Sequence, residues 1–362
     1  MTNILKVGIV GASASRGWAK ISHVPAVQQL EGLELAAVAT QDQPSADAAA
    51  KAFGAKKAYA NAKALFTDPD IAIVTVAVNV PAHRELVLGA LAAGKHVYCE
   101  YPLGRNIAET EEMAQAARKA GVHAVIGLQL RCNPAAGRAR ELLRDGVIGR
   151  VLSARILSTT MAFGYATERA MAFAENPENG VTLVSIQGAH TIDLAISILG
   201  PFADIQALAS TQYPQIAVEG GPPQLRITPD HLAMTARLAA GSPVLIEVVG
   251  GRPANATPFR FEVTGETGVL VLQGGAPRGA QSGVLSLTVN GRQQAIAPTP
   301  VIDPETAANV SVCYARLRDD IRTGTRTVPG FDDAVLMTRL IDDVMTAART
   351  GQRVLASDWP QA

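Results

Sequence analysis

The first third of the chain alternates short apolar runs with segments of helical spacing, and this alternation constrains the fold more than any other feature. Residues 5–10 are apolar and end at Gly11, after which the apolar residues of 17–30 recur at helical spacing. Strand-like runs then recur at 33–39, 71–78, 95–100 and 122–128, separated by helical segments at 42–53, 81–93 and 107–120. This order predicts a doubly wound parallel sheet, an N-terminal Rossmann domain whose ligand lies beyond the carboxyl ends of the strands.

The pattern changes after residue 134. A helix is predicted at 135–145, another at 181–199, and two more at 304–323 and 332–350. Between them lie longer runs of strand type, at 151–159, 204–210, 233–238, 244–249, 259–264, 269–272 and 285–289. Asn290-Gly291 is a strong hairpin signal, so these runs indicate a large, mainly antiparallel open sheet with helices on one face. We therefore expect a dinucleotide-binding domain at 1–132 and an α+β domain for substrate binding and oligomerisation at 133–362.

Composition excludes several classes of partner. The chain has 362 residues with 32 basic and 32 acidic side chains, so no net field attracts nucleic acid or anionic lipid. Uninterrupted apolar stretches stay below the roughly 18 residues of a membrane helix, and a strand starts too early for a signal segment. We expect a cytoplasmic protein with a small-molecule partner. Cys99, Cys132 and Cys313 are odd in number and far apart, which argues against disulfides and against a thiolate metal site; no metal is expected.

The segment Gly11 to Gly17 follows the first strand and opens the first helix. Backbone N–H groups in such a turn can bind a pyrophosphate, and we assign Gly11, Ser13, Ala14, Ser15, Arg16 and Gly17 to the cofactor. The spacing is irregular, because serine stands at the second glycine position of the usual fingerprint. The alternative is a tight turn without a ligand.

The second strand ends in Thr40-Gln41, where NAD-specific folds usually carry an acidic residue for the adenosine ribose. Without that carboxylate a 2′-phosphate is not repelled, and Arg16 and Ser15 can attract it. We therefore expect NADP or NAD as cofactor, with NADP slightly favoured. Arg16 as a merely solvated cation is the competing interpretation.

His190 and Asp193 stand three residues apart in the predicted helix at 181–199, so both side chains project from one face and can work as a pair. An imidazole with its ordinary pKa near neutrality suits proton transfer. The competing interpretations are a structural histidine and a surface carboxylate.

Three motifs together resemble the Gfo/Idh/MocA family of sugar and polyol dehydrogenases: Glu100-Tyr101-Pro102, the run 127–131, and Gly188 to Asp193. Residues 17–20, 229–232 and 250–253 are similar to the branch that includes the galactose-regulon repressor of yeasts. The family motif is Glu-Lys-Pro, and its lysine contacts both substrate and nicotinamide; here Tyr101 takes that position.

The resemblance implies roles for further residues. Ala77, Val78, Asn79, Glu100, Tyr101 and Gln129 would line the cofactor, and Trp18 would lie against its nicotinamide half. The histidine of the family's Gly-x-His-x-x-Asp motif faces the nicotinamide and the substrate hydroxyl, which implies that role for His190. His83 matches a histidine that closes a family loop, although a structural helix-start role competes with cofactor binding. Arg131, Tyr165, Arg169 and Asn179 are candidates for substrate contacts.

Two functions follow from the resemblance. The first is an NAD(P)-dependent oxidoreductase acting on a sugar, polyol or glycoside derivative, with His190, Asp193 and Tyr101 as catalytic residues. The second is a non-catalytic NAD(P)-binding regulator, because the repressor also lacks the family lysine. In this family the open sheet face pairs with a second subunit, and residues 244–249 are apolar on both sides, so we expect a homodimer or higher homo-oligomer.

Overall fold

The structure is a computed structural model that describes residues 4–253, 259–296 and 302–355. Its contacts divide the chain into two compact units. The described residues within Met1–Gln129 and Pro300–Val335 form the first unit, and those within Leu130–Thr299 and Leu336–Ala362 form the second. The predicted boundary after residue 132 lies close to the observed one after Gln129. The predicted second domain, 133–362, differs because 300–335 group with the first unit.

The first unit is built on a parallel sheet, as predicted, but the sheet has six strands, and its edge strand at Lys57–Tyr59 was not predicted. The strand order is β3-β2-β1-β4-β5-β6, which is the order of a Rossmann fold with two mononucleotide-binding halves. The strands are β1 (Leu5–Val10), β2 (Leu33–Ala39), β3 (Lys57–Tyr59), β4 (Ile73–Val76), β5 (His96–Cys99) and β6 (Ala124–Ile126). The helices are the π-helical turn η1 (Ala19–His23), α1 (Val24–Gln29), α2 (Gln43–Phe53), α3 (Ala62–Thr67), the 3₁₀ turn η2 (Val80–Ala82), α4 (His83–Ala92), α5 (Ile107–Ala120), η3 (Gln129–Cys132), η8 (Glu305–Ala307) and α8 (Ala308–Thr323).

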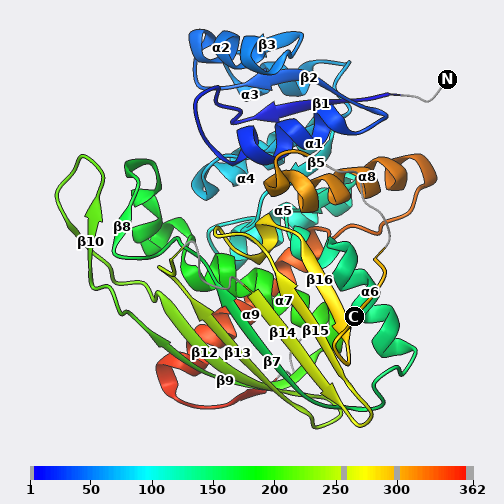
Figure 1. The fold of residues 1–362 in the computed structure, drawn as a ribbon. Helices are drawn as coiled ribbons and strands as arrows, with labels where there is room; N and C mark the ends of the chain where they lie inside the picture. Colours follow the sequence, from blue (N-terminus) through cyan, green and yellow to red (C-terminus); the bar gives the residue numbers. More distant parts are fainter. Residues whose placement is uncertain (1–3, 254–258, 297–301, 356–362) are drawn as a thin grey trace. The chain divides into compact units, whose positions relative to one another are not determined.

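Residues 302–335 belong to the first unit because their apolar and polar side chains pack there. Helix α8 lies against α1 and η1 (Figure 1). Tyr314 of α8 is fully buried and hydrogen-bonded to His23 and Thr75. The backbone of Ile126 donates to Pro329, which extends the pairing at β6. Sequence periodicity predicted α8 as a helix but carried no signal of where it packs.

The second unit contains a nine-stranded sheet with the order β17-β16-β15-β14-β7-β13-β12-β9-β18. Every neighbouring pair is antiparallel except β7 with β13, which confirms the mainly antiparallel prediction. The strands are β7 (Val151–Thr159), β9 (Phe202–Ser210), β12 (His231–Leu238), β13 (Pro243–Val249), β14 (Phe259–Gly265), β15 (Val269–Gly274), β16 (Leu285–Val289), β17 (Arg292–Gln293) and β18 (Val354–Leu355). A second, small sheet of β8 (Ala166–Thr167), β10 (Gln215–Val218) and β11 (Gln224–Leu225) was not predicted.

Helices cover one face of the nine-stranded sheet. They are α6 (Pro134–Arg144), the π-helical turn η6 (Val184–Gly188), α7 (Ala189–Leu199) and α9 (Phe331–Thr350), with short 3₁₀ turns η4 (Arg169–Glu175), η5 (Pro177–Asn179) and η7 (Ala280–Ser282). Figure 1 draws α7 and α9 behind the strands, and η6 contacts β7, β12 and β13. Alternate residues of β12 and β13 are buried and exposed, so the other face of these strands is open. This arrangement is the predicted one.

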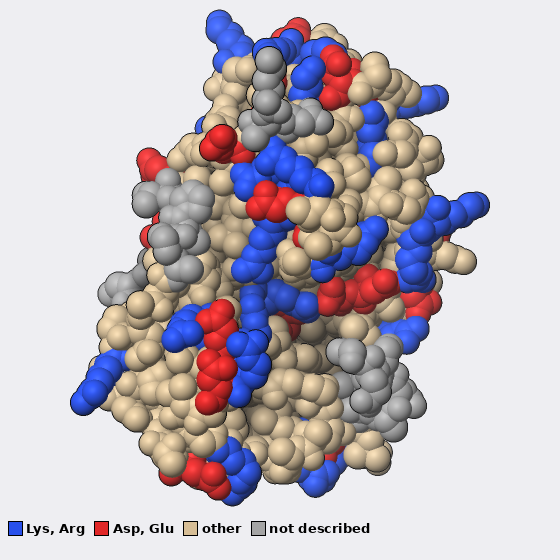
Figure 2. Space-filling view, turned by 90° about the vertical axis from the view of Figure 1, so that its right-hand side faces the viewer, with Lys and Arg blue, Asp and Glu red and all other residues tan. Residues whose placement is uncertain are grey.

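The open face is hollowed rather than flat. A depression of about 720 Å³ lies over β7, β9, β12, β13 and β14. Its lining includes the exposed side chains of Leu208 and Leu245 beside Arg155, Glu247 and Arg260. Charges of both signs also alternate among the described residues of the face shown in Figure 2, as the balanced composition predicts.

One described helical stretch, Pro177–Leu199, is long and apolar enough to cross a membrane by length and composition. No helix of this kind was expected from the sequence, because only uninterrupted runs of apolar residues were counted. Within this structure 72% of the most apolar window is buried. The window includes His190 and Asp193, and a single buried helix of this kind is typical of the core of a folded domain.

Candidate functional site

The glycine turn lies where the strand order of the first sheet reverses, between β1 and β4. Gly11 has a φ of +93°, and a Cβ there would lie 2.5 Å from the Ala77 carbonyl oxygen and 2.6 Å from a methyl group of Val78. The backbone therefore needs glycine at this position for its own packing. The same contact brings the turn beside Ala77 and Val78 at the crevice where Rossmann folds bind dinucleotides.

The polar groups of the turn face solvent or each other. Ser13 and Ser15 hydroxyls lie 3.2 Å apart, Lys20 donates to the Ser15 carbonyl at 3.3 Å, and Arg16 is exposed. Regular helical structure starts at Ala19, two residues later than predicted. Among the described residues, the indole Nε1 of Trp18 and the side-chain oxygen Oε1 of Gln129 are buried without hydrogen-bond partners. Buried polar atoms without partners are costly in a folded protein, so both atoms fit a site that holds a polar ligand.

The end of β2 has an acidic residue that the sequence analysis did not use. Thr40 donates to the Asp42 carbonyl at 3.0 Å, and its hydroxyl lies 2.6 Å from that of Ser45. The Asp42 carboxylate accepts from the Ser45 N–H at 2.8 Å and caps α2. Hydrogen bonds from the Ser45 backbone and side chain lower the pKa of Asp42. Gln41 is exposed beside this cap.

His83 joins the loops that follow β4 and β5. Its Nδ1 lies 2.9 Å from the Pro102 carbonyl oxygen and its Nε2 lies 3.0 Å from that of Val78. The ring is buried, and burial lowers the pKa of His83. Both ring nitrogens face backbone carbonyls, which supports the structural interpretation: His83 positions the loops that contain Asn79 and Tyr101.

Glu100 ends a chain of hydrogen bonds that the sequence analysis missed. Its carboxylate lies 3.0 Å from Nε2 of His23, whose Nδ1 lies 2.9 Å from the Tyr314 hydroxyl. The Thr75 hydroxyl lies 2.6 Å from the same Tyr314 oxygen. An ionised carboxylate only accepts, so His23 donates to Glu100 through Nε2. Nδ1 of His23 and the Thr75 hydroxyl both bind the Tyr314 hydroxyl, which connects Glu100 to β4 and α8.

This network fixes the start of the Glu100-Tyr101-Pro102 motif. A Cβ at Gly127, just after β6, would lie 2.8 Å from the Glu100 carboxylate and 3.2 Å from its Cα, so a side chain there would displace the carboxylate from this network. Tyr101, at the position of the family lysine, is only 7% exposed, and its peptide bond to Pro102 is cis. No local pattern could have identified Tyr314, which follows His23 by 291 positions.

His190 lies on α7 in the second unit and is 3% exposed. Burial lowers its pKa to about 4, which differs from the near-neutral value expected from the sequence. The imidazole is therefore neutral at pH 7. A neutral imidazole can accept a proton, but it is a weaker base than one that titrates near 7.

Asp193 pairs with Arg131, which the sequence suggested as a substrate contact. Its fully buried carboxylate accepts from Arg131 through Nε at 2.8 Å and through Nη2. The Arg131 side chain is one quarter exposed. The structure therefore brings Arg131 and Asp193 together, and the pairing of Asp193 with His190 stays a prediction.

The remaining substrate candidates lie on the segment between β7 and η6. Tyr165 is 71% exposed and Arg169 is exposed, whereas the Asn179 amide donates to the Phe173 carbonyl at 2.7 Å. Asn179 thus stabilises its own loop. All three cysteines are buried thiols, and burial raises the pKa of Cys99 well above its ordinary value. Within the described ranges, His, Cys, Asp and Glu side chains form no group of three or more suited to a metal ion.

Two protein-family models match the chain. Residues 5–128 match the model described as oxidoreductase family, NAD-binding Rossmann fold, and residues 134–274 match the model of the Gal80p C-terminal domain. The dehydrogenase aclE of Aspergillus oryzae is 29% identical over 97% of this chain and 98% of its own length. The galactose/lactose metabolism regulatory protein GAL80 of Saccharomyces cerevisiae is 28% identical over 75% of this chain and 67% of its own length.

Solved structures share the fold over nearly the whole chain. A super-repressor mutant of Gal80p from Saccharomyces cerevisiae has a TM-score of 0.86 at 24% identity and covers 98% of both chains. Levoglucosan dehydrogenase in complex with NADH and levoglucosan has a TM-score of 0.82 at 21% identity and covers 99% of this chain and 100% of its own. A curated levoglucosan dehydrogenase from Pseudarthrobacter phenanthrenivorans is 27% identical over 62% of this chain and 60% of its own length.

Proposed function

Because the chain belongs to the Gfo/Idh/MocA oxidoreductase family, with that family's NAD-binding domain and a Gal80p-type second domain, we propose that it is an NAD(P)-dependent oxidoreductase. The reaction transfers hydride between the nicotinamide and a hydroxyl or carbonyl of a sugar, polyol or glycoside derivative. One observation carries the proposal: the glycine turn lies at the reversal point of a 3-2-1-4-5-6 sheet, with the buried polar atoms of Trp18 and Gln129 unsatisfied by the described residues.

In this proposal the bound cofactor supplies the hydride chemistry and the side chains manage the proton. His190, neutral at pH 7 because of burial, accepts the hydroxyl proton during oxidation. Tyr101 offers a hydrogen bond where the family has an ammonium. Glu100, held through His23, Tyr314 and Thr75, fixes the backbone that carries Tyr101. Arg131, whose charge is neutralised by Asp193 and whose side chain is one quarter exposed, contacts substrate hydroxyls.

We favour NADP over NAD as the cofactor. Arg16 is exposed on the glycine turn and has no acidic partner among the described residues, so its guanidinium is available to a 2′-phosphate. Asp42 is the nearest acidic residue to the end of β2, and its carboxylate is engaged by the α2 cap. The ionised Asp42 carboxylate keeps its negative charge, so we expect only a modest preference for NADP over NAD.

A non-catalytic dinucleotide-binding regulator is the second candidate, and the substitution of the family lysine by Tyr101 favours it. Relatives of both kinds match the chain at similar identity. The two candidates differ in whether reduced cofactor appears when a substrate is supplied.

The oxidoreductase and the regulator are distinguished by offering a panel of sugars, polyols and anhydrosugars with NADP and with NAD. The absorbance of the reduced cofactor measures turnover. We expect turnover by the wild type on at least one member and a loss in Tyr101→Lys, because an ammonium beside the cationic oxidised nicotinamide lacks a matched environment here. Tyr101→Phe, which deletes only a hydroxyl, should cost less. A wild type inert on the whole panel, together with an active Tyr101→Lys, would establish the regulator instead.

The open face of the nine-stranded sheet supports a homodimer. Exposed Leu208 and Leu245 lie among charges of both signs, as a self-complementary surface requires. Cys99, Cys132 and Cys313 are buried and form no disulfide, which fits the reducing cytoplasm, and cell fractionation tests that placement.

A further inference from the structure

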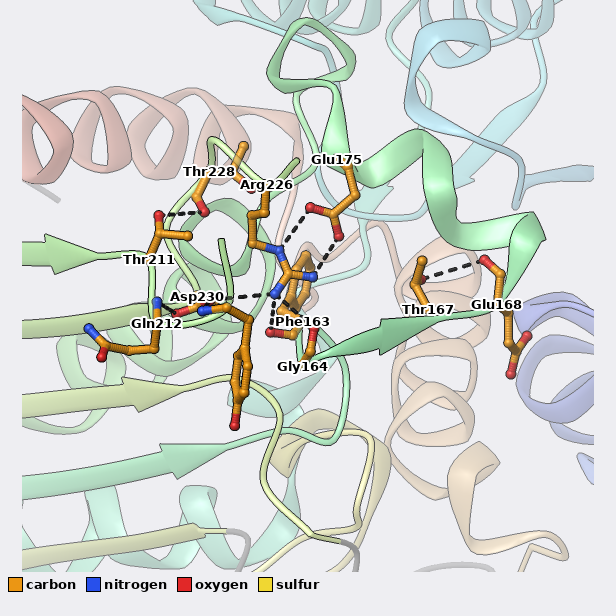
Figure 3. A network of polar contacts seen from close by, with 11 residues as sticks. Phe163, Gly164, Thr167, Glu168, Glu175, Thr211, Gln212, Arg226, Thr228 and Asp230 are labelled. Carbon is orange, nitrogen blue, oxygen red and sulfur yellow. Dashed lines mark hydrogen bonds and ion pairs between the residues drawn. The ribbon is translucent and has the colours of Figure 1, made fainter. Parts of the chain in front are cut away.

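Arg226, which directly follows β11, is a fully buried cation in the second unit. Its side chain has no exposed surface, and Glu175 binds it in a bidentate manner. The Nε–Oε2 distance is 2.9 Å and the Nη2–Oε1 distance is 2.7 Å. Figure 3 shows the guanidinium at the centre of several separate chain segments.

The third nitrogen of Arg226 holds a different part of the chain. Nη1 donates to the carbonyl oxygens of Phe163 at 2.7 Å and Gly164 at 2.9 Å. Asp230, 3.4 Å away, balances the charge and itself accepts the backbone N–H groups of Gln212 and Tyr213, each at 2.8 Å. Both ends of residues 165–174 are thus bound to one guanidinium, at Phe163-Gly164 and at Glu175.

The backbone at the first end is strained. Phe163 has a φ of 59°, which a bulky side chain rarely adopts. A Cβ at Gly164 would lie 2.8 Å from the Cα of Gly251, so the turn packs directly on the end of the β13 strand. Such conformations are costly and persist only where surrounding contacts impose them. The two hydrogen bonds from Arg226 are contacts of this kind.

The segment closed in this way presents side chains to the exterior. Tyr165 is 71% exposed, Met171 is 41% exposed, and Glu168 and Arg169 are exposed as well. A large aromatic ring with neighbouring charges is well suited to contact a polyhydroxylated ligand. Holding such a loop before binding reduces the ordering entropy that the ligand must otherwise offset.

We infer that Arg226 is a positioning residue: with Glu175 it closes residues 165–174 into a preformed loop for recognition of the carbohydrate-like substrate. The substrate part of this inference rests on the proposed function. Only a planar guanidinium with five donors can bind a carboxylate in a bidentate manner and two carbonyls at once, so a lysine cannot replace it.

Arg226→Lys keeps the buried positive charge and removes the bridging geometry. Glu175→Gln keeps the side-chain shape and removes the charge at the other end. Arg150→Lys is the matched control, because Arg150 pairs with Glu266 in the same unit away from the loop. Backbone hydrogen exchange is followed at Met171 within the loop, at Asn176 just after it, and at Ala217 and Glu219, which donate to Tyr165 and Thr167.

We expect exchange at these amides to be at least threefold faster in Arg226→Lys and Glu175→Gln than in wild type, and unchanged in Arg150→Lys. Exchange within threefold of wild type in the folded variants overturns the inference. If Arg226→Lys does not fold, the exchange rates of Glu175→Gln alone decide whether the ion pair holds the loop.

With a substrate from the panel, we expect KM to rise about tenfold in Arg226→Lys with kcat within twofold. An unchanged KM despite faster exchange overturns the role in substrate recognition. If the wild type turns over nothing, the proposed function fails, while the exchange experiment still decides whether Arg226 holds the loop.

Discussion

At the scale of single residues, burial decides the protonation state of His190. Its ring is 3% exposed, and desolvation of the cation lowers the pKa from 6.5 to about 4. The same side chain can therefore accept a proton at any pH from 5 to 8 without first losing one. Because the unfolded chain binds that proton more readily, the lowered pKa also links His190 to stability.

The sign of that linkage follows from the two pKa values. Between pH 6.5 and about 4 the unfolded state binds more protons at residue 190, so stability falls as the pH falls through this window. The loss between pH 7 and pH 5 is about 2 kcal/mol for this group. His190→Gln, which does not titrate, should reduce the difference in unfolding free energy between pH 7 and pH 5 by that amount. Urea denaturation at both values measures it, and an unaltered difference would show that His190 is not buried as a neutral ring.

At the scale of elements, local pattern predicted most of the architecture. The alternation of 5–128 gave the parallel sheet, and period-two runs gave the long strands of the second sheet, because both depend on side chains close in sequence. The short strands β3, β8, β10 and β11 were not predicted, because a few residues carry no measurable period.

The side-chain partners could not be predicted in the same way. Tyr314 reaches His23, Arg131 reaches Asp193 and Arg226 reaches Glu175 across 291, 62 and 51 positions. Periodicity identifies which face of an element is buried, but not which distant side chain it meets. Candidate residues can therefore be proposed from sequence motifs, whereas the hydrogen-bond networks around them could not be predicted.

The glycine turn gives a prediction at this scale. Arg16→Ala should weaken NADP binding about tenfold, since a charge-assisted hydrogen bond contributes about 1.5–3 kcal/mol, and should change NAD binding less than threefold. Lys20→Ala is the control, because Lys20 donates to the Ser15 carbonyl in the same turn. Calorimetric titration of wild type and both variants with both dinucleotides provides the six affinities. Equal losses for NADP and NAD would remove the basis for the NADP preference.

At the scale of the whole molecule, we propose that the chain assembles through the open face of the nine-stranded sheet. Leu208 is 67% exposed and Leu245 is 43% exposed, and the strand register places Leu208 opposite Ala233 and Leu245 opposite Thr235 on neighbouring strands. Apolar side chains of this size on a monomer surface mark an interaction site when they are contiguous.

Sedimentation should therefore give a mass of at least twice 37.8 kDa at micromolar concentration. The double variant Leu208→Asp, Leu245→Asp should sediment as a monomer, because buried unpaired carboxylates strongly oppose association. Ile4→Asp, at a position 54% exposed in the first unit, should keep the wild-type mass. A monomeric wild type would contradict the dimer.

We propose that His190 transfers the proton in a nicotinamide-dependent oxidation. The most direct test is the kcat of His190→Ala against wild type, measured at saturating NADP and substrate with the dinucleotide dissociation constant determined in parallel. We expect kcat of His190→Ala to fall roughly 10²–10⁴-fold, because the variant lacks the general base, while the dissociation constant for the dinucleotide changes little. A variant that keeps the wild-type kcat would contradict it.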